Sequence, residues 1–213
     1  MGFLDLPVEI RNNIYRQLLV AKQTLMLFKD RGSEVVEVFV PGYSFRALPL
    51  LRTNRRVQEE ACAILYGSNC FNFVDTTEYQ GELLCAFLKA IGVRNASLLT
   101  HVSINFPALN LSGIDVAELN VVNGSLWTVK LLQEQCTNLR ILETIVQAEN
   151  SFGLVESDDL DSSLVGSALS QVQAQFEAIP NLKKVVVTFY TGIPSTFVRN
   201  SFEGNGWVVQ QGR

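Results

Sequence analysis

The chain has 213 residues, a length typical of one large domain or two small ones. Hydrophobic residues make up 47% of it and charged residues 18%, whereas a typical globular chain is about 25% charged. This composition excludes a disordered chain, because the apolar side chains can offset the entropy lost on ordering. The formal net charge of −4 provides no attraction toward nucleic acid or an anionic membrane, so neither is expected as a partner.

The first predicted element is a helix over residues 8–19. Pro7 suits the first helical position, where its missing N–H is not needed. Ile10, Ile14 and Leu18 recur every four residues and form one apolar stripe along this helix.

A hairpin and a second helix are expected next. Residues 24–40 contain two β-rich runs on either side of Gly32, which indicates a β-hairpin. A helix is predicted to start around Pro49 and to stop at Gly67, where glycine favours a helix end. Residues 70–74 have the pattern of a short strand, and we expect the hairpin to pair with it in one sheet.

The rest of the chain has the pattern of a repeat of about forty residues, a helix followed by a strand. In three stretches a leading leucine precedes apolar residues that alternate with period two, which indicates strands with one buried face. This order is typical of an α/β solenoid, whose strands pair in parallel with the helices along one side. The strands are expected at 99–106, 139–146 and 182–189, and the helices at 78–91, 125–135 and 163–178.

The segments between the repeats are less regular. Residues 107–124 are expected to form a surface loop with one helical turn from Asp115, and residues 207–209 a last strand. A group of acidic residues precedes the third repeat helix, and it fits interaction with the helix dipole better than a calcium loop, whose spacing it does not match. These residues are Glu156, Asp158, Asp159 and Asp161.

The residues that usually carry catalysis do not form a recognisable set. His101 is the only histidine, and it is expected to face water at the start of a strand. The sequence contains neither a phosphate-binding loop nor a serine-hydrolase motif. The four cysteines lack paired short spacings and are interpreted as reduced, buried thiols rather than zinc ligands. We therefore expect no enzyme activity, no metal and no cofactor.

Four arginines cluster between residues 46 and 56. Arg55 and Arg56 precede Glu59 and Glu60 by one helical turn, so their side chains lie on the same helix face. Ion pairs within the helix are therefore expected, rather than a nucleic-acid-binding patch.

Two segments of the first 75 residues resemble F-box proteins. The first is similar to the opening helix of an F-box and reads LPVEIRNNIYRQLL over residues 6–19. The second resembles the segment that follows in a large group of fungal F-box-like proteins and reads LLRTNRRVQEEACAILYGSNCFNF over residues 50–73. Together they cover about a third of the chain.

The resemblance implies a fold and a function. The fold is α/β, with a helical F-box-like unit over residues 1–75 that carries a hairpin inserted at about 24–40, followed by a short leucine-rich-like α/β solenoid over 76–213. F-box helices dock on the Skp-type adaptor of a cullin–RING ubiquitin ligase, and a downstream domain holds the protein substrate. The implied partners are thus a Skp-type adaptor and an unknown protein substrate. The residues implied to bind the adaptor are Leu6, Pro7, Glu9, Ile10, Ile14 and Leu18.

An alternative function is an F-box-derived scaffold or interaction protein that does not bind the adaptor. The exposure of the first helix distinguishes the two, because a receptor must leave Leu6, Pro7, Ile10 and Ile14 partly exposed. In a scaffold, the hairpin would cover them.

The start of the sequence bears on location. Charged residues and Pro7 interrupt the first dozen residues, so the basic start and unbroken apolar stretch of a signal peptide are not present there. We expect an intracellular protein, cytoplasmic or nuclear, without a membrane-spanning segment.

Overall fold

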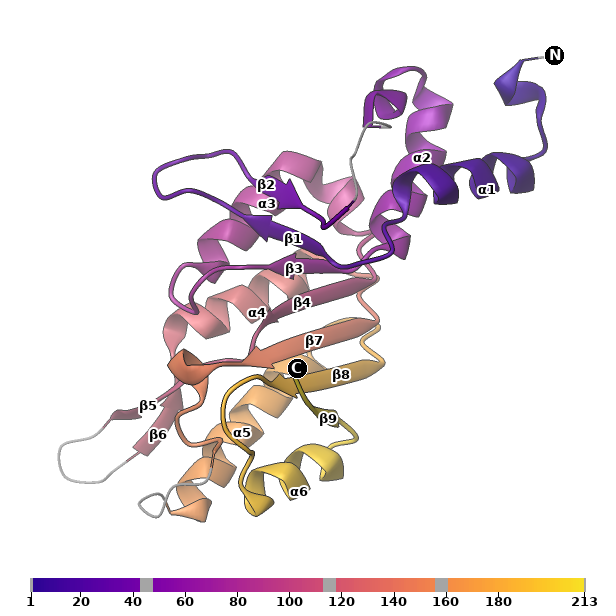
Figure 1. Ribbon diagram of the computed structural model, residues 1–213. Coiled ribbons are helices and arrows are strands. Elements are labelled where there is room, and N and C mark those ends of the chain that lie inside the picture. The colour runs from indigo at the N-terminus through magenta and orange to yellow at the C-terminus, as the bar shows by residue number, and fades with distance from the viewer. Residues whose placement is uncertain (1, 43–47, 113–117, 156–160, 213) are drawn as a thin grey trace.

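The computed structural model describes residues 2–42, 48–112, 118–155 and 161–212. It is a mixed α/β structure built around one large sheet (Figure 1). The strands of this sheet are β1 (Leu25–Phe28), β2 (Glu37–Phe39), β3 (Phe71–Phe73), β4 (His101–Asn105), β7 (Ile141–Val146), β8 (Lys184–Phe189) and β9 (Val208–Gln211). Their order is β2-β1-β3-β4-β7-β8-β9, and every neighbouring pair except β1 and β2 is parallel.

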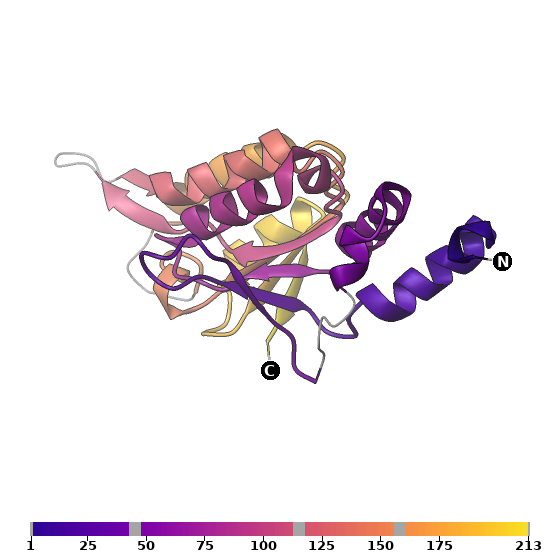
Figure 2. The ribbon, with the colours of Figure 1, turned by 90° about the horizontal axis from the view of Figure 1, so that it is seen from above.

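The helices fall into two groups. Three of the longer helices lie along one face of the sheet. The first two pack together beyond the amino-terminal ends of the parallel strands (Figures 1 and 2). The pair beyond the edge is α1 (Val8–Leu19) and α2 (Arg55–Ser68). The helices that follow are α3 (Gln80–Ala96), α4 (Asn123–Gln135), α5 (Ser162–Glu177) and α6 (Thr196–Gly204).

Two apolar clusters follow this division. The larger one fills the space between the sheet and the helices that cover it, and it includes Phe73 and Phe106 from the sheet side and Phe176 from α5. The smaller one lies between α1 and α2, with Tyr15 and Leu19 fully buried at its centre. The other face of the sheet carries no helix in Figure 2, and we call it the open face.

The repeat predicted from the sequence is confirmed at the level of strand pairing. β4, β7 and β8 pair in parallel, so that His101 lies beside Ile141 and Ile141 beside Lys184. The helices predicted before these strands are α3, α4 and α5, within a few residues of the expected bounds except at the end of α3. Alternate residues of the strands, such as Val102 and Leu142, enter the core, because successive side chains point to opposite faces.

The predicted hairpin is also confirmed. β1 and β2 are antiparallel, with Met26 opposite Phe39, and β1 pairs in parallel with β3. Gly32 in the connection has φ of 81°, a conformation that glycine adopts without a steric penalty. The sheet is therefore continuous across residue 75 and contains strands from both sides of it.

The predicted second helix is wrong at its start. Residues 48–52 form a 3-10 turn, and α2 begins only at Arg55. Asn54 is the N-cap, because its side chain accepts a hydrogen bond of 2.8 Å from the backbone N–H of Arg56. Asn54 therefore caps the start of α2, which continues past Gly67 to Ser68.

The region from 107 to 124 was expected to be a loop, and this is wrong. It contains a second, two-stranded sheet formed by β5 (Leu109–Ser112) and β6 (Glu118–Val121). Leu109, Leu119 and Val121 are buried in the main core, and this burial stabilises the hairpin. Asp115, where a helical turn was expected, lies outside the described residues.

The bounds of α3 also differ from the sequence pattern. The helix was expected from residue 78 but begins at Gln80, after the N-cap Tyr79, whose side chain makes no capping hydrogen bond. The helix was expected to stop at Gly92, but it resumes after that residue, whose φ of 76° interrupts it, and runs to Ala96. Of the acidic group before α5, Asp161 is the N-cap, as expected from the helix-dipole interpretation, and 156–160 lie outside the described residues.

None of the described helices is both long enough and apolar enough to cross a bilayer.

Candidate protein-docking site

Helix α1 has two different faces. Arg11, Tyr15 and Leu19 are buried and face α2. The predicted stripe lies on the outer face, where Ile10 is 46% exposed and Leu18 is 42% exposed. The apolar residues that recur every four positions therefore lie on the outer face of this helix rather than on the face that packs against α2.

The remaining predicted docking residues lie at the start of the same helix. Pro7 and Glu9 are exposed, whereas Leu6 and Ile14 are half-buried. Pro7 is the N-cap, one position earlier than expected, and its carbonyl accepts hydrogen bonds of 3.1 Å from the backbone N–H groups of the third and fourth residues of the helix. The structure thus places all six predicted residues on α1 and the turn before it, where four are exposed and Leu6 and Ile14 are half-buried.

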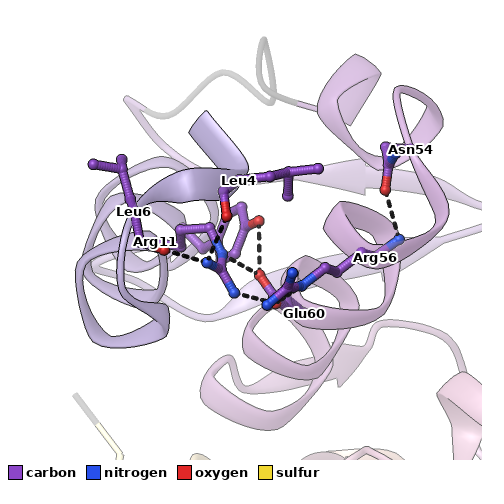
Figure 3. Close-up of polar contacts among 7 residues, drawn as sticks. Leu4, Leu6, Arg11, Asn54, Arg56 and Glu60 are labelled. Carbon is purple, nitrogen blue, oxygen red and sulfur yellow. Dashed lines mark hydrogen bonds and ion pairs between the residues drawn. The ribbon is translucent and has the colours of Figure 1, made fainter. Parts of the chain in front are cut away.

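A partly buried ion pair holds this turn in place. The guanidinium of Arg11, which is 2% exposed, donates from Nε to Glu60 Oε2 at 2.8 Å and from Nη2 to Glu60 Oε1 at 2.5 Å. Its third nitrogen, Nη1, donates to the carbonyl oxygens of Leu6 and Leu4 (Figure 3). Because one planar group binds both α2 and the entering chain, we call Arg11 and Glu60 the latch.

Further groups complete the environment of Glu60. The hydroxyl of Tyr15 donates to its Oε2 at 3.2 Å. Arg56 Nε donates to its Oε1 at 3.1 Å (Figure 3). The hydrogen bond from Arg11 is the largest of the causes that lower the pKa of Glu60 to about 2. Burial, followed by the bond to Glu60, raises the pKa of Tyr15. The carboxylate of Glu60 is therefore the charged form at neutral pH.

A second buried group joins the helices to the sheet. Asn69, which is 3% exposed, donates from Nδ2 to the carbonyl oxygens of Leu19 at 2.9 Å and Leu65 at 2.7 Å. Its Oδ1 accepts from the backbone N–H of Ala21 at 2.8 Å. One side chain thus satisfies the ends of α1 and α2 and the start of the chain toward β1.

The expected ion pairing within the helix is confirmed for Arg55 and Arg56, whereas Arg52 lies in the 3-10 turn before α2. Arg55 pairs with Glu59 at 3.3 Å, one helical turn away. Glu59 also accepts from Arg94 of α3 at 2.9 Å, which connects the two groups of helices. Arg46 lies outside the described residues.

A third polar group lies on the open face of the sheet. His101 is 26% exposed and its Nε2 lies 2.9 Å from Glu143 Oε1, so it is paired rather than simply facing water as expected. Cys70 completes the group, because a ligand atom of each of the three residues lies within 4.8 Å of the others. The sequence pattern did not bring them together, although the aligned strands already placed His101 beside β7.

A thiol, an imidazole and a carboxylate are also the parts of a cysteine nucleophile triad. Here, burial raises the pKa of the Cys70 thiol to about 12, which opposes formation of the reactive thiolate. The group also lies where the parallel strands begin, whereas active sites of open α/β sheets lie at their carboxyl ends. The arrangement therefore does not favour nucleophilic catalysis.

A cavity of about 640 Å³ does lie near the carboxyl ends of β3 and β4. Arg31 lines it and stands 4.9 Å above the ring of Tyr79, and the carboxylates of Glu78 and Glu149 line it as well. With one positive and two negative side chains, the lining indicates neither an anionic nor a cationic ligand, so no ligand class can be assigned to this cavity.

Comparison with known proteins adds no relative. Protein-family models, curated proteins and solved structures were all searched, and none matches the chain. The F-box resemblance therefore depends on the two sequence segments at 6–19 and 50–73.

Proposed function

We propose that the chain is a protein-interaction module of the F-box receptor type. In this proposal α1 docks on the Skp-type adaptor of a cullin–RING ubiquitin ligase, and the sheet region holds a target protein. The observation that carries it is the exposed apolar stripe of α1, because a helix presents such side chains at spacings of three and four residues to a partner groove. Ile10, at 46%, is the most exposed residue of this stripe.

The latch supports this assignment. A docking helix binds more tightly when it is already held in its bound conformation, since less entropy is lost on association. Arg11 fixes the carbonyl oxygens of the turn before α1 to Glu60 of α2, and this places Leu6 and Pro7 at a defined position at the start of the helix.

The open face of the sheet is the surface that we assign to the target protein. Phe39 of β2, Met26 of β1 and Val208 of β9 are 53%, 38% and 43% exposed. The pairings of Met26 with Phe39 and Asn72 place their side chains on the face opposite to the core. In this proposal residues 1–75 contain the F-box-like unit and residues 76–213 the leucine-rich-like solenoid, a class of repeat that binds partners on an extended sheet surface.

The experiment is a titration of the full chain with a purified Skp-type adaptor. We expect saturable binding by the parent chain and at least a tenfold loss of affinity with Ile10→Asp. Replacing an apolar side chain that is buried in an interface costs roughly 1–4 kcal/mol of binding free energy. An aspartate in the first turn of α1 interacts favourably with the helix dipole, so the variant is expected to melt at the parent temperature.

The matched control is Val93→Asp on α3, whose side chain is 76% exposed and lies outside the proposed surface. It is expected to bind like the parent. A second variant, Leu6→Ala with Pro7→Ala, is also expected to abolish binding while leaving the sheet folded, because Arg11 binds the carbonyl of Leu6 and not its side chain. If the parent does not capture the adaptor, or if the double variant melts far below it, the receptor function is wrong and the scaffold function replaces it.

A further inference from the structure

Three residues with metal-ligating side chains meet on the open face of the sheet. Cys70 directly precedes β3, His101 is the first residue of β4, and Glu143 is the third residue of β7. These strands are adjacent and parallel, which places side chains of matching parity about 5 Å apart. All three side chains are half-buried.

The register explains why the three side chains converge. Phe71 pairs with Val102, so the residues before them, Cys70 and His101, are neighbours. Glu143 pairs with Ser103 and is therefore one step further along the same face. Since serine is small, the longer side chain of Glu143 extends back over it to His101.

We propose that Cys70, His101 and Glu143 bind one Zn²⁺ ion through a sulfur, an imidazole nitrogen and a carboxylate oxygen. These are the three ligand types that zinc uses, at distances of about 2.0–2.3 Å. Tetrahedral ligands at such distances lie about 3.3–3.8 Å apart. The atoms here lie within 4.8 Å of one another, and His101 Nε2 and Glu143 Oε1 are 2.9 Å apart. Side-chain displacements of about 1 Å or less bring all three to the separations of tetrahedral ligands.

Charge and softness favour zinc over other divalent ions. The thiolate and the carboxylate together carry two negative charges, which a divalent ion neutralises in a half-buried site. Mg²⁺ and Ca²⁺ prefer oxygen ligands, whereas sulfur and imidazole suit zinc. On binding, the Sγ–H bond of Cys70 is replaced by an Sγ–Zn bond and the proton passes to solvent. The hydrogen bond with His101 is the main cause that lowers the pKa of Glu143, and the charge of the exposed Lys184, which is outside the ligand set, adds to it.

Three protein ligands leave a fourth tetrahedral position, which water fills because the group is partly exposed. The ion would cross-link β3, β4 and β7. Cys70 is next to Asn69, which joins the ends of α1 and α2 to the sheet. The zinc is therefore expected to stabilise the fold at this junction, independently of any adaptor bound by α1.

The test uses the full chain, first freed of metal with a chelator and kept reduced. Co²⁺ is a spectroscopic substitute for zinc, and we expect one equivalent of it to bind. The bound ion is expected to give the visible bands of tetrahedral cobalt and a sulfur-to-cobalt charge-transfer band, and all of these bands are expected to disappear when Zn²⁺ displaces it. With zinc at about 100 times its Kd, we expect the melting temperature to rise by roughly 5–10 °C.

Two variants and one control make the test specific. Cys70→Ser is expected to lose the charge-transfer band, and Glu143→Gln, which keeps the volume and a hydrogen bond to His101, to bind zinc at least tenfold more weakly. Cys85→Ser removes another half-buried thiol and is expected to behave like the parent. Melting curves without metal establish that each variant is folded.

The proposal is overturned if the parent binds no stoichiometric Co²⁺ or Zn²⁺, or if Cys70→Ser and Glu143→Gln bind as tightly as the control. Neither result alters the adaptor titration, because that surface is on α1.

Discussion

At the scale of single residues, the latch is the feature that most defines the N-terminal region. Arg11 has the burial of a core residue at 2% exposure, although arginine is rarely buried without a partner. Its partner Glu60 receives hydrogen bonds from three side chains on two helices. The sequence spacing indicated only the pairing with Arg56, because a contact 49 residues away leaves no local pattern.

The latch makes a prediction about pH. The pKa of Glu60 is lowered from 4.5 to about 2 in the folded chain, so its carboxylate contributes stability above pH 4.5 that is lost as the pH falls toward 2. At neutral pH, Glu60→Gln is expected to melt roughly 5–10 °C below the parent, because Arg11 is left without its charged partner.

This difference is expected to shrink between pH 4.5 and pH 2, as the parent loses the same charge. Thermal melts followed by circular dichroism across pH 2–7 measure it. Other carboxylates with lowered pKa values, such as Glu59 and Glu143, titrate in both proteins and cancel in the comparison. A constant difference across this range would show that the latch is not the source.

At the scale of elements, the helices were predictable in position but not in orientation. The four-residue period of Ile10, Ile14 and Leu18 correctly indicated a helix at 8–19. It did not reveal which face is buried, because the inward face contains the polar Arg11 and the amphipathic Tyr15. The sequence therefore placed the six proposed docking residues on this helix and the turn before it, whereas the latch depends on a contact between distant residues.

The strands show the same limit in another form. Period-two alternation located β4, β7 and β8, and their alignment gave the observed register. The β5–β6 hairpin was missed because asparagines and a glycine resemble a loop, and its burial depends on contacts with the distant core. Cys70, His101 and Glu143 were missed for a related reason. The register that brings Cys70 beside His101 is set by the pairing of β3 with β4, and no sequence pattern indicated this register.

Asn69 provides the prediction at this scale. Replacing it with alanine leaves the carbonyl oxygens of Leu19 and Leu65 and the N–H of Ala21 without this partner. The free energy of unfolding in urea is expected to fall by about 2–4 kcal/mol, the cost of buried polar groups left unpaired. Asn138→Ala is the control, because Asn138 is exposed and donates a single hydrogen bond to Ser97, and its loss is expected to be under about 1 kcal/mol. Equal losses would mean that Asn69 does not join the helices to the sheet.

At the scale of the whole molecule, the continuous sheet makes the two regions dependent on each other. β1 and β3 provide Leu25, Leu27, Phe71 and Phe73 to the core that also contains the repeat strands. Removing residues 1–75 would expose the apolar surface that these four side chains cover and would leave one edge of β4 unpaired.

We therefore expect limited proteolysis to yield no stable fragment that begins near residue 76. Cleavage followed over time by mass spectrometry, in buffer and after addition of mild denaturant, tests this. Fragments are expected to disappear together with the intact chain, as in a single cooperative unit. A protease-resistant fragment over 76–213 would show instead that this region folds alone.

The parallel order of the sheet also determines how the chain assembles in time. Within the large sheet, β1 and β2 are joined by the short segment 29–36, whereas each of the pairs β4–β7 and β7–β8 closes a loop of about forty residues. The entropy of loop closure is lost before such distant contacts stabilise the chain, so folding is expected to take milliseconds to seconds rather than microseconds. During that interval the apolar faces of the strands are exposed to other chains, so association between copies is expected to compete with folding until the sheet has formed.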